Sequence, residues 1–439
     1  MSRSYRSVID LTGQLQQIDQ FADILQDKID YDSAHDEDIV KGIRIVEDFL
    51  RRKHRVCYGG SAMNAHLPKK YKFYDPDKTI PDYDFFSPDV EGDVEDLVKT
   101  LKAEGFTEVD SRPGMHAGTM KVFLNFFGIA DISSIPNDLY DIFEDRAKTI
   151  NGINFMDIDS LRMMMYLEIS RPKGDVERWH KVYERILLLQ YVAKPKHCKV
   201  IHSHKEIAIP QEVNEAIFNY GLNNSRVFAG FSVLELYNES KKKKQDGTFL
   251  ESANLPIIMY SPNLEMDAGS IKSILGEGST IEHLEEIGET VPPTTIIYKN
   301  KKPVLLLVEE TACHAYNTLN YKRRIVRIAS LDTIITLYFS LELANNDMIR
   351  KFFPMRINCE AQAAINISNY LRTHVGRSQF PFISTECSGH QKSKQTLLRE
   401  KFARAAKEKK MKSKTKSKSK SKSKSKSKSK SKSKKTRKN

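Results

Sequence analysis

The sequence has few cysteines and no cysteine-pairing pattern. The five cysteines, Cys57, Cys198, Cys313, Cys359 and Cys387, are an odd number, lie far apart and include no Cys-x-x-Cys pair. Disulfide-rich domains and thiolate zinc modules both need closely and regularly spaced cysteines. We therefore expect neither a disulfide framework nor a cysteine-rich zinc site, and the scattered thiols favour a reducing compartment.

Long apolar runs are also absent. The best run, residues 304–308, is far shorter than the ~18 apolar residues of a membrane span, and residues 1–14 have no apolar core for a secretory leader. We expect an intracellular chain without a membrane segment. The only metal-like cluster outside the carboxylates described below matches no zinc spacing and lies in an expected interdomain connection; it comprises His197, Cys198, His202 and His204.

Positive charge is concentrated at one end of the chain. Residues 391–439 contain 23 Lys and Arg against two Glu, a net charge of +21, whereas the whole chain carries +13, so the other 390 residues carry −8. From Lys412 onward Lys alternates with Ser or Thr, a composition that cannot bury a core and should be disordered. This tail is either a solvated or nuclear-targeting appendage or a sequence-independent RNA-holding segment.

The rest of the chain has a globular composition, with 40% hydrophobic residues, 21 Phe and 18 Tyr. Apolar residues recur at helical spacing in residues 7–28 and 36–52, which predicts two amphipathic helices. Short strands are then expected at residues 55–58, 83–86, 120–126 and 129–133, and helices at residues 94–104, 158–169 and 177–191.

Four segments of this region return later in the same order, at offsets of about 170 to 176 residues. The segment Arg55-Val-Cys-Tyr-Gly-Gly-Ser61 is echoed by Arg226-Val-Phe-Ala-Gly-Phe-Ser232, and the others are a strand ending in Ser-Pro, a hairpin and a helix. The sequence therefore predicts two copies of one α/β unit, joined near residues 192–215.

The two copies differ in their carboxylates. Aligning the Ser-Pro pairs sets Asp84 against Ile258 and Asp82 against Pro256, and aligning the hairpins sets Asp131 close to Leu306. The second copy is therefore expected to keep the scaffold without the acidic residues.

Asp82 and Asp84 flank Tyr83 in an expected strand, where the two-residue period puts both side chains on one face. Paired carboxylates repel, and a divalent cation such as Mg²⁺ removes the conflict. Asp131 lies in the apolar stretch 129–132, a costly place for a charge unless it is also a ligand. Three such carboxylates can hold two metal ions.

A glycine turn precedes the carboxylates. Gly59, Gly60 and Ser61 follow one expected strand and open an expected helix. Glycines allow a phosphate to approach the backbone, a helix N-terminus offers free N–H groups, and Ser61 adds a hydroxyl donor.

Together, Gly60-Ser61, Asp82-Tyr-Asp84 and Asp131 resemble the signature of the polymerase-β-like nucleotidyltransferases. Over roughly residues 1–390 the chain is similar to the poly(A) polymerase catalytic subunits of large DNA viruses, particularly mimivirus-like giant viruses. The related poxviral enzyme also has a catalytic domain followed by a degenerate copy. Residues 62–81, between Ser61 and Asp82, are longer than this signature usually allows and indicate an insertion.

The resemblance implies an α/β (α+β) chain with two nucleotidyltransferase-like domains. It implies that Gly59, Gly60 and Ser61 bind the ATP phosphates, and that Asp82, Asp84 and Asp131 are the catalytic residues and hold two Mg²⁺ or Mn²⁺ ions. The expected regions are an N-terminal helical region (1–54), the catalytic domain (55–195), the degenerate domain (196–390) and the tail (391–439).

The implied activity is template-independent polyadenylation of mRNA 3′ ends, in which AMP passes from ATP to the RNA 3′-hydroxyl and pyrophosphate is released. The implied partners are RNA and a second copy of the chain, and the implied location is the host cytoplasm, its viral factory, or the virion. Two alternatives stay open: another nucleotidyl transfer, such as tRNA-end repair or oligonucleotide synthesis, and a non-catalytic RNA-binding role.

Overall fold

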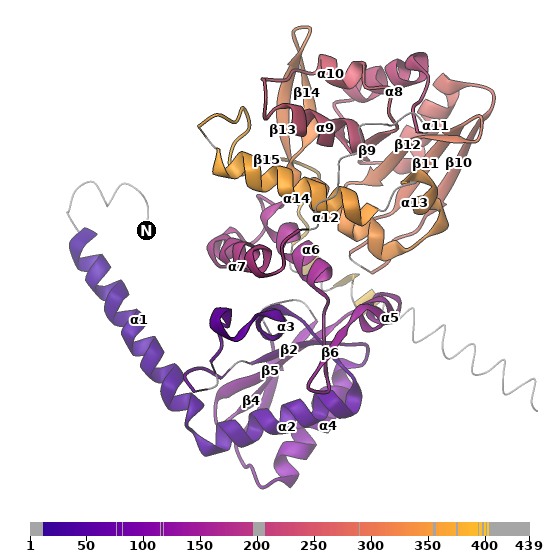
Figure 1. Ribbon diagram of the computed structural model, residues 1–439. Helices are drawn as coiled ribbons and strands as arrows, with labels where there is room; N and C mark the ends of the chain where they lie inside the picture. Colours follow the sequence, from indigo (N-terminus) through magenta and orange to yellow (C-terminus); the bar gives the residue numbers. More distant parts are fainter. Residues whose placement is uncertain are drawn as a thin grey trace, which may run out of the picture.

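The computed structural model describes residues 12–195 and 207–403, apart from residues 76, 81, 115, 117, 289, 354–356, 375, 394, 397–398 and 401. These residues form two mixed β-sheets, each with its own helices, one above the other in Figure 1. The predicted mixed α/β class with two like domains is confirmed. The Lys/Ser run from residue 412 and the His and Cys cluster at residues 197–204 lie outside the described residues.

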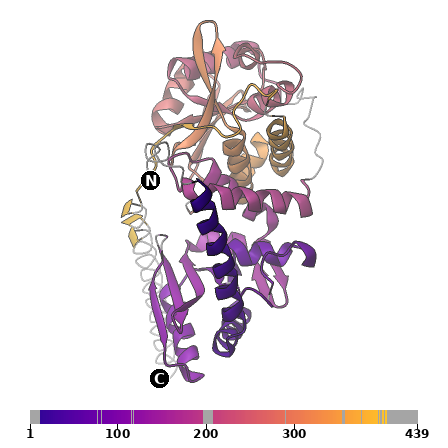
Figure 2. The same cartoon turned by 90° about the vertical axis from the view of Figure 1, so that its left-hand side faces the viewer.

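Two helices precede the first sheet, α1 (Thr12–Ala34) and α2 (Glu37–Lys53), close to the predicted ranges. The side chain of Asp36 caps α2 by accepting a 3.0 Å hydrogen bond from the Ile39 amide, and acidic residues in the first turn and basic residues in the last complement the helix dipole. Figures 1 and 2 show α1 extending away from α2, on the side of the molecule that Figure 2 turns toward the viewer.

The first sheet has seven strands in the order β3-β4-β5-β2-β1-β7-β6. The strands are β1 (Val56–Cys57), β2 (Tyr83–Ser87), β3 (Val109–Pro113), β4 (Thr119–Leu124), β5 (Phe127–Ser134), β6 (Lys148–Ile150) and β7 (Ile153–Phe155). The helical segments of this half are α3 (Gly59–His66), the short 3₁₀ turn η1 (Lys69–Tyr71), α4 (Val90–Ala103) and α5 (Asn137–Arg146).

The second sheet has eight strands in the order β10-β11-β12-β9-β8-β14-β13-β15. The strands are β8 (Val227–Ala229), β9 (Ile257–Ser261), β10 (Ser279–Leu284), β11 (Thr294–Lys299), β12 (Lys302–Glu309), β13 (His314–Tyr321), β14 (Arg324–Ala329) and β15 (Glu386–Ser388). The helices of this half are α8 (Gln211–Asn223), α9 (Phe231–Glu239), α10 (Thr248–Glu251), α11 (Leu264–Leu275), α12 (Leu331–Ala344), α13 (Asp347–Phe352) and α14 (Ile357–Thr373).

The two sheets repeat one topology. In each, the first strand pairs antiparallel with the second, the second runs parallel to the later strand of a hairpin, and the first runs parallel to a strand from a further hairpin. The second sheet differs by the added edge strand β15. The internal repeat read from the sequence is therefore a repeat of structure.

Helices α6 (Ile158–Ile169) and α7 (Trp179–Val192) join the two halves, and the short 3₁₀ turn η2 (Val176–Arg178) leads into α7. Helix α6 packs against both α7 and α12, and α12 packs against α14. Figure 1 shows α7 beneath α14 and above α3. The predicted domain limits at residues 55, 196 and 391 stay predictions.

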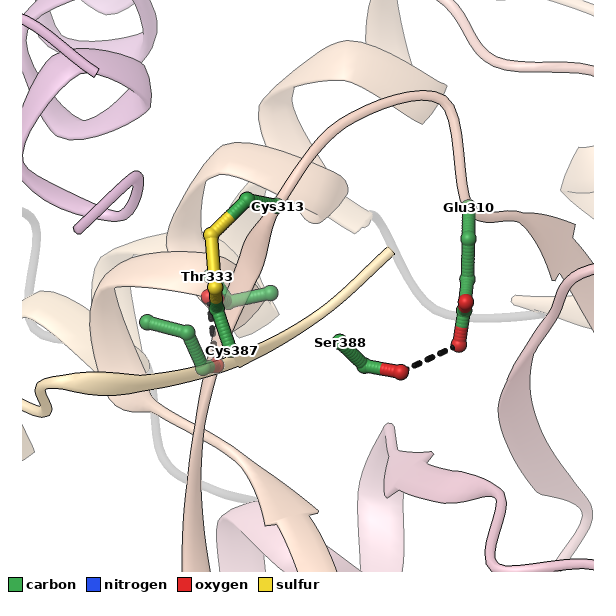
Figure 3. The surroundings of a disulfide bond; sticks show 6 residues. Glu310, Cys313, Thr333, Cys387 and Ser388 are labelled. Atoms are coloured by element: carbon green, nitrogen blue, oxygen red, sulfur yellow. Dashed lines mark hydrogen bonds between the residues drawn. A yellow bond between two sulfur atoms is a disulfide. The ribbon is translucent and has the colours of Figure 1, made fainter. Parts of the chain in front are cut away.

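The cysteines do not stay apart as expected. Cys313 and Cys387, 74 residues apart in sequence, form a disulfide that ties the start of β13 to β15 (Figure 3). Ser388 adds a 2.7 Å hydrogen bond to Glu310 beside it. Cys359 is also disulfide-bonded, and Cys57 is buried and free. The expectation of no disulfide framework did not foresee this pair, because antiparallel pairing of β13 with β15 brings together residues whose spacing in sequence gives no sign of it.

Candidate active site

The predicted carboxylates meet in the middle of the first sheet, on the neighbouring strands β2 and β5 and just ahead of β2. Asp84 in β2 and Asp131 in β5 are register partners in adjacent parallel strands, and Asp82 lies one residue ahead of β2 rather than within it. Burial, with the charges of Asp82 and Asp131, raises the pKa of Asp84 to about 7. The three carboxylates that the spacing brought together are therefore close enough to repel one another.

Lys121 partly neutralises this set, and sequence reasoning missed it. Its Nζ lies 3.2 Å from Oδ1 of Asp131 and 3.5 Å from Oδ2 of Asp82. Asp131 Oδ1 nevertheless accepts no hydrogen bond of good geometry, and burial raises the pKa of Asp131 in spite of Lys121. The expected hairpin brings the two strands together, but the register shift between Val122 and Phe123 is what sets Lys121 opposite Asp131, so this partner could not be read from the turn alone.

The glycine turn lies beside Asp84 because β1 ends where the antiparallel β2 begins. The amide of Tyr58 donates a 2.9 Å hydrogen bond to the Asp84 carbonyl, and α3 starts at Gly59 without a side-chain cap. Gly59 has φ +67°, and a Cβ there would lie 2.5 Å from Oδ2 of Asp84. Only glycine allows the uncapped helix N-terminus to come this close to the carboxylate.

Ser61 makes a contact that sequence reasoning did not anticipate, and its contact with phosphate stays a prediction. Its hydroxyl donates a 2.6 Å hydrogen bond to the carbonyl of Asp82, and its side chain is buried. The turn therefore fixes the backbone that carries the first carboxylate. This arrangement supports a positioning role for Ser61 beside the expected contact with phosphate.

Basic side chains of α7 also face the glycine turn, which has Asp84 beside Gly59 and Arg185 beside Gly60. A Cβ on Gly60 would lie 3.2 Å from Nη2 of Arg185 and 2.6 Å from the hydroxyl of Tyr74. Burial, together with the charges of Arg185 and Arg178, lowers the pKa of Lys181, although its side chain reaches the surface. Sequence reasoning missed these cations because their meeting with the turn depends on how α7 packs.

Residues 62–81, expected to be an insertion, link the glycine turn to α7. Oδ1 of Asn64 accepts hydrogen bonds from the amides of Phe73 and Tyr74 at 3.0 and 3.2 Å, and its Nδ2 donates to the Tyr74 carbonyl. The guanidinium of Arg185 lies 5.2 Å from the centre of the Phe73 ring. The insertion thus places Tyr74 between α3 and α7.

The donor set suits hard divalent cations in kind. It offers three carboxylates, one of them with a buried oxygen that accepts no hydrogen bond, beside an uncapped helix N-terminus. Among the described residues, however, no three His, Cys, Asp or Glu side chains are already arranged around a common point as metal ligands. Lys121 lies between Asp82 and Asp131, so binding a cation there requires its amine to move.

The second copy fills the same place with apolar side chains. Ile258 in β9 and Leu306 in β12 are register partners, as Asp84 and Asp131 are. Gly230, with φ +84°, occupies the position of Gly59, and a Cβ there would lie 2.6 Å from Cγ1 of Ile258. The predicted exchange of Asp84 for Ile258 is confirmed at the level of individual contacts. Leu306 occupies the position of Asp131 itself, with no offset along the strand.

A second motif, which sequence reasoning missed, is kept in both copies. Arg55 binds the buried Asp93 through Nη2 and Oδ1 at 3.1 Å, and Ser87 donates to the same carboxylate at 2.7 Å. The second copy repeats the motif: Arg226 binds Asp267 at 2.8 Å and Ser261 donates at 2.6 Å. These residues tie β1 or β8 to the start of α4 or α11, so they are structural. The serines of this motif, Ser87 and Ser261, are those of the Ser-Pro pairs that the sequence comparison aligned.

No helix in the described part of the chain is both long and apolar enough to cross a membrane.

A sequence model of the family "Poly(A) polymerase catalytic subunit" matches residues 44–175, which include all the predicted site residues. A candidate poly(A) polymerase catalytic subunit of Acanthamoeba polyphaga mimivirus is 27% identical over 231 residues, 49% of this chain and 38% of that protein. The corresponding protein of African swine fever virus is 27% identical over 185 residues, 40% of this chain and 38% of its own length. The matches thus span well under half the length of these curated relatives.

The resemblance to viral poly(A) polymerase catalytic subunits is confirmed. A crystal structure of the Megavirus polyadenylate synthase superposes with a TM-score of 0.69 at 17% identity, over 90% of this chain and 84% of that one. This chain therefore shares the fold of that structure, beyond the segment in which the sequence match is found.

Proposed function

We propose that this chain is a poly(A) polymerase that extends mRNA 3′ ends without a template. The RNA 3′-oxygen attacks the α-phosphorus of ATP, the bond from that phosphorus to the bridging oxygen breaks, and pyrophosphate leaves with AMP joined to the RNA. The observation that carries the proposal is the meeting of Asp82, Asp84 and Asp131 with a glycine turn and the cations of α7, in one copy of the repeat.

The residues divide into an acidic and a basic side. On the acidic side, Asp82, Asp84 and Asp131 would hold two Mg²⁺ or Mn²⁺ ions, which when bound supply charge neutralisation and activate the hydroxyl. Lys121 lies 3.2 Å from Oδ1 of Asp131, and the pKa of Asp84 is about 7, so a bound cation would displace the amine from Asp131 and a proton from Asp84.

On the basic side, Gly59 and Gly60 offer backbone N–H groups to the ATP phosphates, since α3 is uncapped and glycine lets a ligand come close. Arg185 and Lys181 face the same space and would balance the triphosphate charge. Ser61 would hold Asp82 in place through its backbone hydrogen bond.

We further propose that the chain acts on RNA as a homodimer. Helix α1 exposes a row of large apolar side chains, each 57–64% exposed, which supports a contact with another chain; they are Ile18, Phe21, Ile24, Leu25 and Ile29. Replacing Phe21 and Ile24 with Ser should shift the mass measured by light scattering from dimer to monomer. An unchanged mass would exclude this surface. We also propose that the chain acts in the host cytoplasm, its viral factory, or the virion, because the curated relatives that it matches are viral proteins.

The proposed reaction is tested by supplying each nucleoside triphosphate singly with a short RNA primer. Long products with ATP alone are expected. Extension with CTP and then ATP would indicate tRNA-end repair, products without a primer would indicate oligonucleotide synthesis, and no extension despite RNA binding would indicate a non-catalytic role.

A further inference from the structure

Helix α7 has two polar or aromatic faces with different neighbours. Lys181 and Arg185, four residues apart, face the glycine turn and the carboxylates. Tyr183, Leu187 and Tyr191 recur at the same spacing on a second stripe, about 80–160° around the helix from the first at 100° per residue. The side chains between the stripes, such as Val182 and Ile186, are buried. The helix is therefore the shared wall of the active site and of a second space.

That second space is a groove of about 850 Å³ between α7 and α14. Rings line it: Tyr183 packs edge-on against Phe382 at 5.4 Å, and Tyr191 and Phe382 are 61% and 41% exposed. Asn366 and Asn369 supply amides, and Lys194 supplies an exposed cation. No Asp or Glu is among the described residues that line the groove, although residues 1–390 as a whole are acidic.

A line of rings and cations connects this groove to the active site. Tyr71, at the end of η1, contacts Tyr191 edge-to-face at 5.2 Å, and Lys70 lies 4.6 Å from the Tyr71 ring. Along the same loop, Phe73 contacts Tyr74 at 4.7 Å, and Tyr74 lies over Gly60. Arg185 and Tyr191 are six residues apart, about 9 Å along the helix. An extended strand could cover this distance in two or three nucleotides.

We propose that the groove between α7 and α14 binds the unpaired bases of the RNA a few nucleotides before its 3′ end. Exposed rings stack on bases of any sequence, and cations beside them follow the phosphates, which is the combination that single-strand binding proteins use. The absence of carboxylates from the lining suits a polyanion better than it suits a basic protein segment. The position of the bases relative to the 3′ end rests on the proposed polymerase function.

The test measures binding of a fluorescent single-stranded RNA to the full chain without ATP. Tyr191→Ala is expected to weaken RNA binding by about tenfold, as loss of one stacked base predicts, whereas Tyr191→Phe keeps the ring and stays within about twofold of wild type. Lys194→Gln should reduce the slope of affinity against salt. Phe126→Ala removes a ring that is 79% exposed on the distant β4–β5 turn and is the matched control.

Crosslinking gives an independent readout. A 4-thiouridine placed a few nucleotides before the 3′ end should attach to the second half of α7 or to the segment around Phe382. Crosslinks elsewhere, together with wild-type RNA affinity in the Tyr191→Ala variant, would overturn the proposal. It would also be overturned if ATP, and not RNA, occupied the groove. If the chain binds RNA through the groove but never extends it, the proposed polymerase function is refuted and the RNA-binding groove is not. If the chain extends RNA and the Tyr191→Ala variant binds RNA with wild-type affinity, the RNA-binding role of the groove is refuted and the polymerase function is not.

Discussion

The two halves of this molecule have the same strand order and the same Arg-Asp-Ser motif, yet they differ at the positions of Asp84 and Asp131. In the second half, Ile258 and Leu306 occupy those positions and are fully buried. The fold therefore does not need the carboxylates. They are costly in a sheet interior, and their presence in one half alone supports the proposal that the chemistry takes place there.

The largest expected difference between the halves is in activity. Replacing Asp82 and Asp84 with Ala should reduce AMP incorporation by at least about a thousandfold, because it removes two of the three proposed metal ligands. The apo fold should persist, since the change relieves repulsion between like charges. Incorporation from labelled ATP into an RNA primer measures the effect.

The matched variant in the second half is Ile258→Ala. It should retain incorporation at permissive temperature while lowering the free energy of unfolding by roughly 2–5 kcal/mol through the cavity it leaves. Strong activity in the double Asp variant, or loss of activity in a folded Ile258→Ala protein, would contradict the assignment of catalysis to the first half.

The shared motif should respond alike in both halves. Asp93→Asn and Asp267→Asn each leave a partly buried arginine without its carboxylate, and each should cost roughly 3–5 kcal/mol of stability. Denaturant titration measures the loss, with exposed Asp347→Asn as the control. A loss confined to one half would mean that the motif has different roles in the two copies.

A smaller and pH-dependent difference is expected at Asp84. Because the pKa of Asp84 is raised to about 7 in the folded state, its carboxyl destabilises the fold as pH rises from the ordinary carboxyl range and does so fully above about pH 7. Asp84→Asn should therefore stabilise the metal-free protein by on the order of a few kcal/mol near pH 8 and by little near pH 3. An increment that does not change with pH would contradict the shift. Ile258→Leu should show no such pH dependence.

The smallest effect expected is that of the basic tail. Truncation after Gln391 should shorten the products made in each encounter and flatten the salt dependence if the tail holds RNA. Unchanged product lengths and salt slope would leave the RNA path entirely on the folded halves. The truncated chain keeps the disulfide to Cys387, so its fold provides an internal control.

The sequence predicted the features that depend on local pattern. Strand and helix periodicity, the repeat, and the exchange of Asp84 for Ile258 followed from spacing, and the structure confirms them. The hairpin could have placed Lys121 near Asp131 but not opposite it, because a register shift between Val122 and Phe123 offsets the two strands. A recognisable turn thus predicts which strands pair, and a bulge decides the exact cross-strand partners.

The remaining features depend on tertiary packing. The approach of Arg185 to Gly60, the groove beside Tyr191 and the Cys313–Cys387 pair join segments 74 or more residues apart, and no local signal announces such contacts. Ser61 shows a further limit. Its presence in the glycine turn was predicted, but its hydrogen bond to the Asp82 carbonyl depends on where the strand that follows the insertion begins.

The most direct test of the central claim is a competition experiment. The full chain is given a short RNA primer, Mg²⁺ and equal amounts of all four nucleoside triphosphates, and the products are sequenced and weighed by mass spectrometry. The proposed function predicts tails of AMP alone, made by wild type and by a folded Ile258→Ala variant and absent with Asp82→Ala/Asp84→Ala. Tails of mixed sequence, a defined short addition, or no extension by the wild-type chain would contradict it.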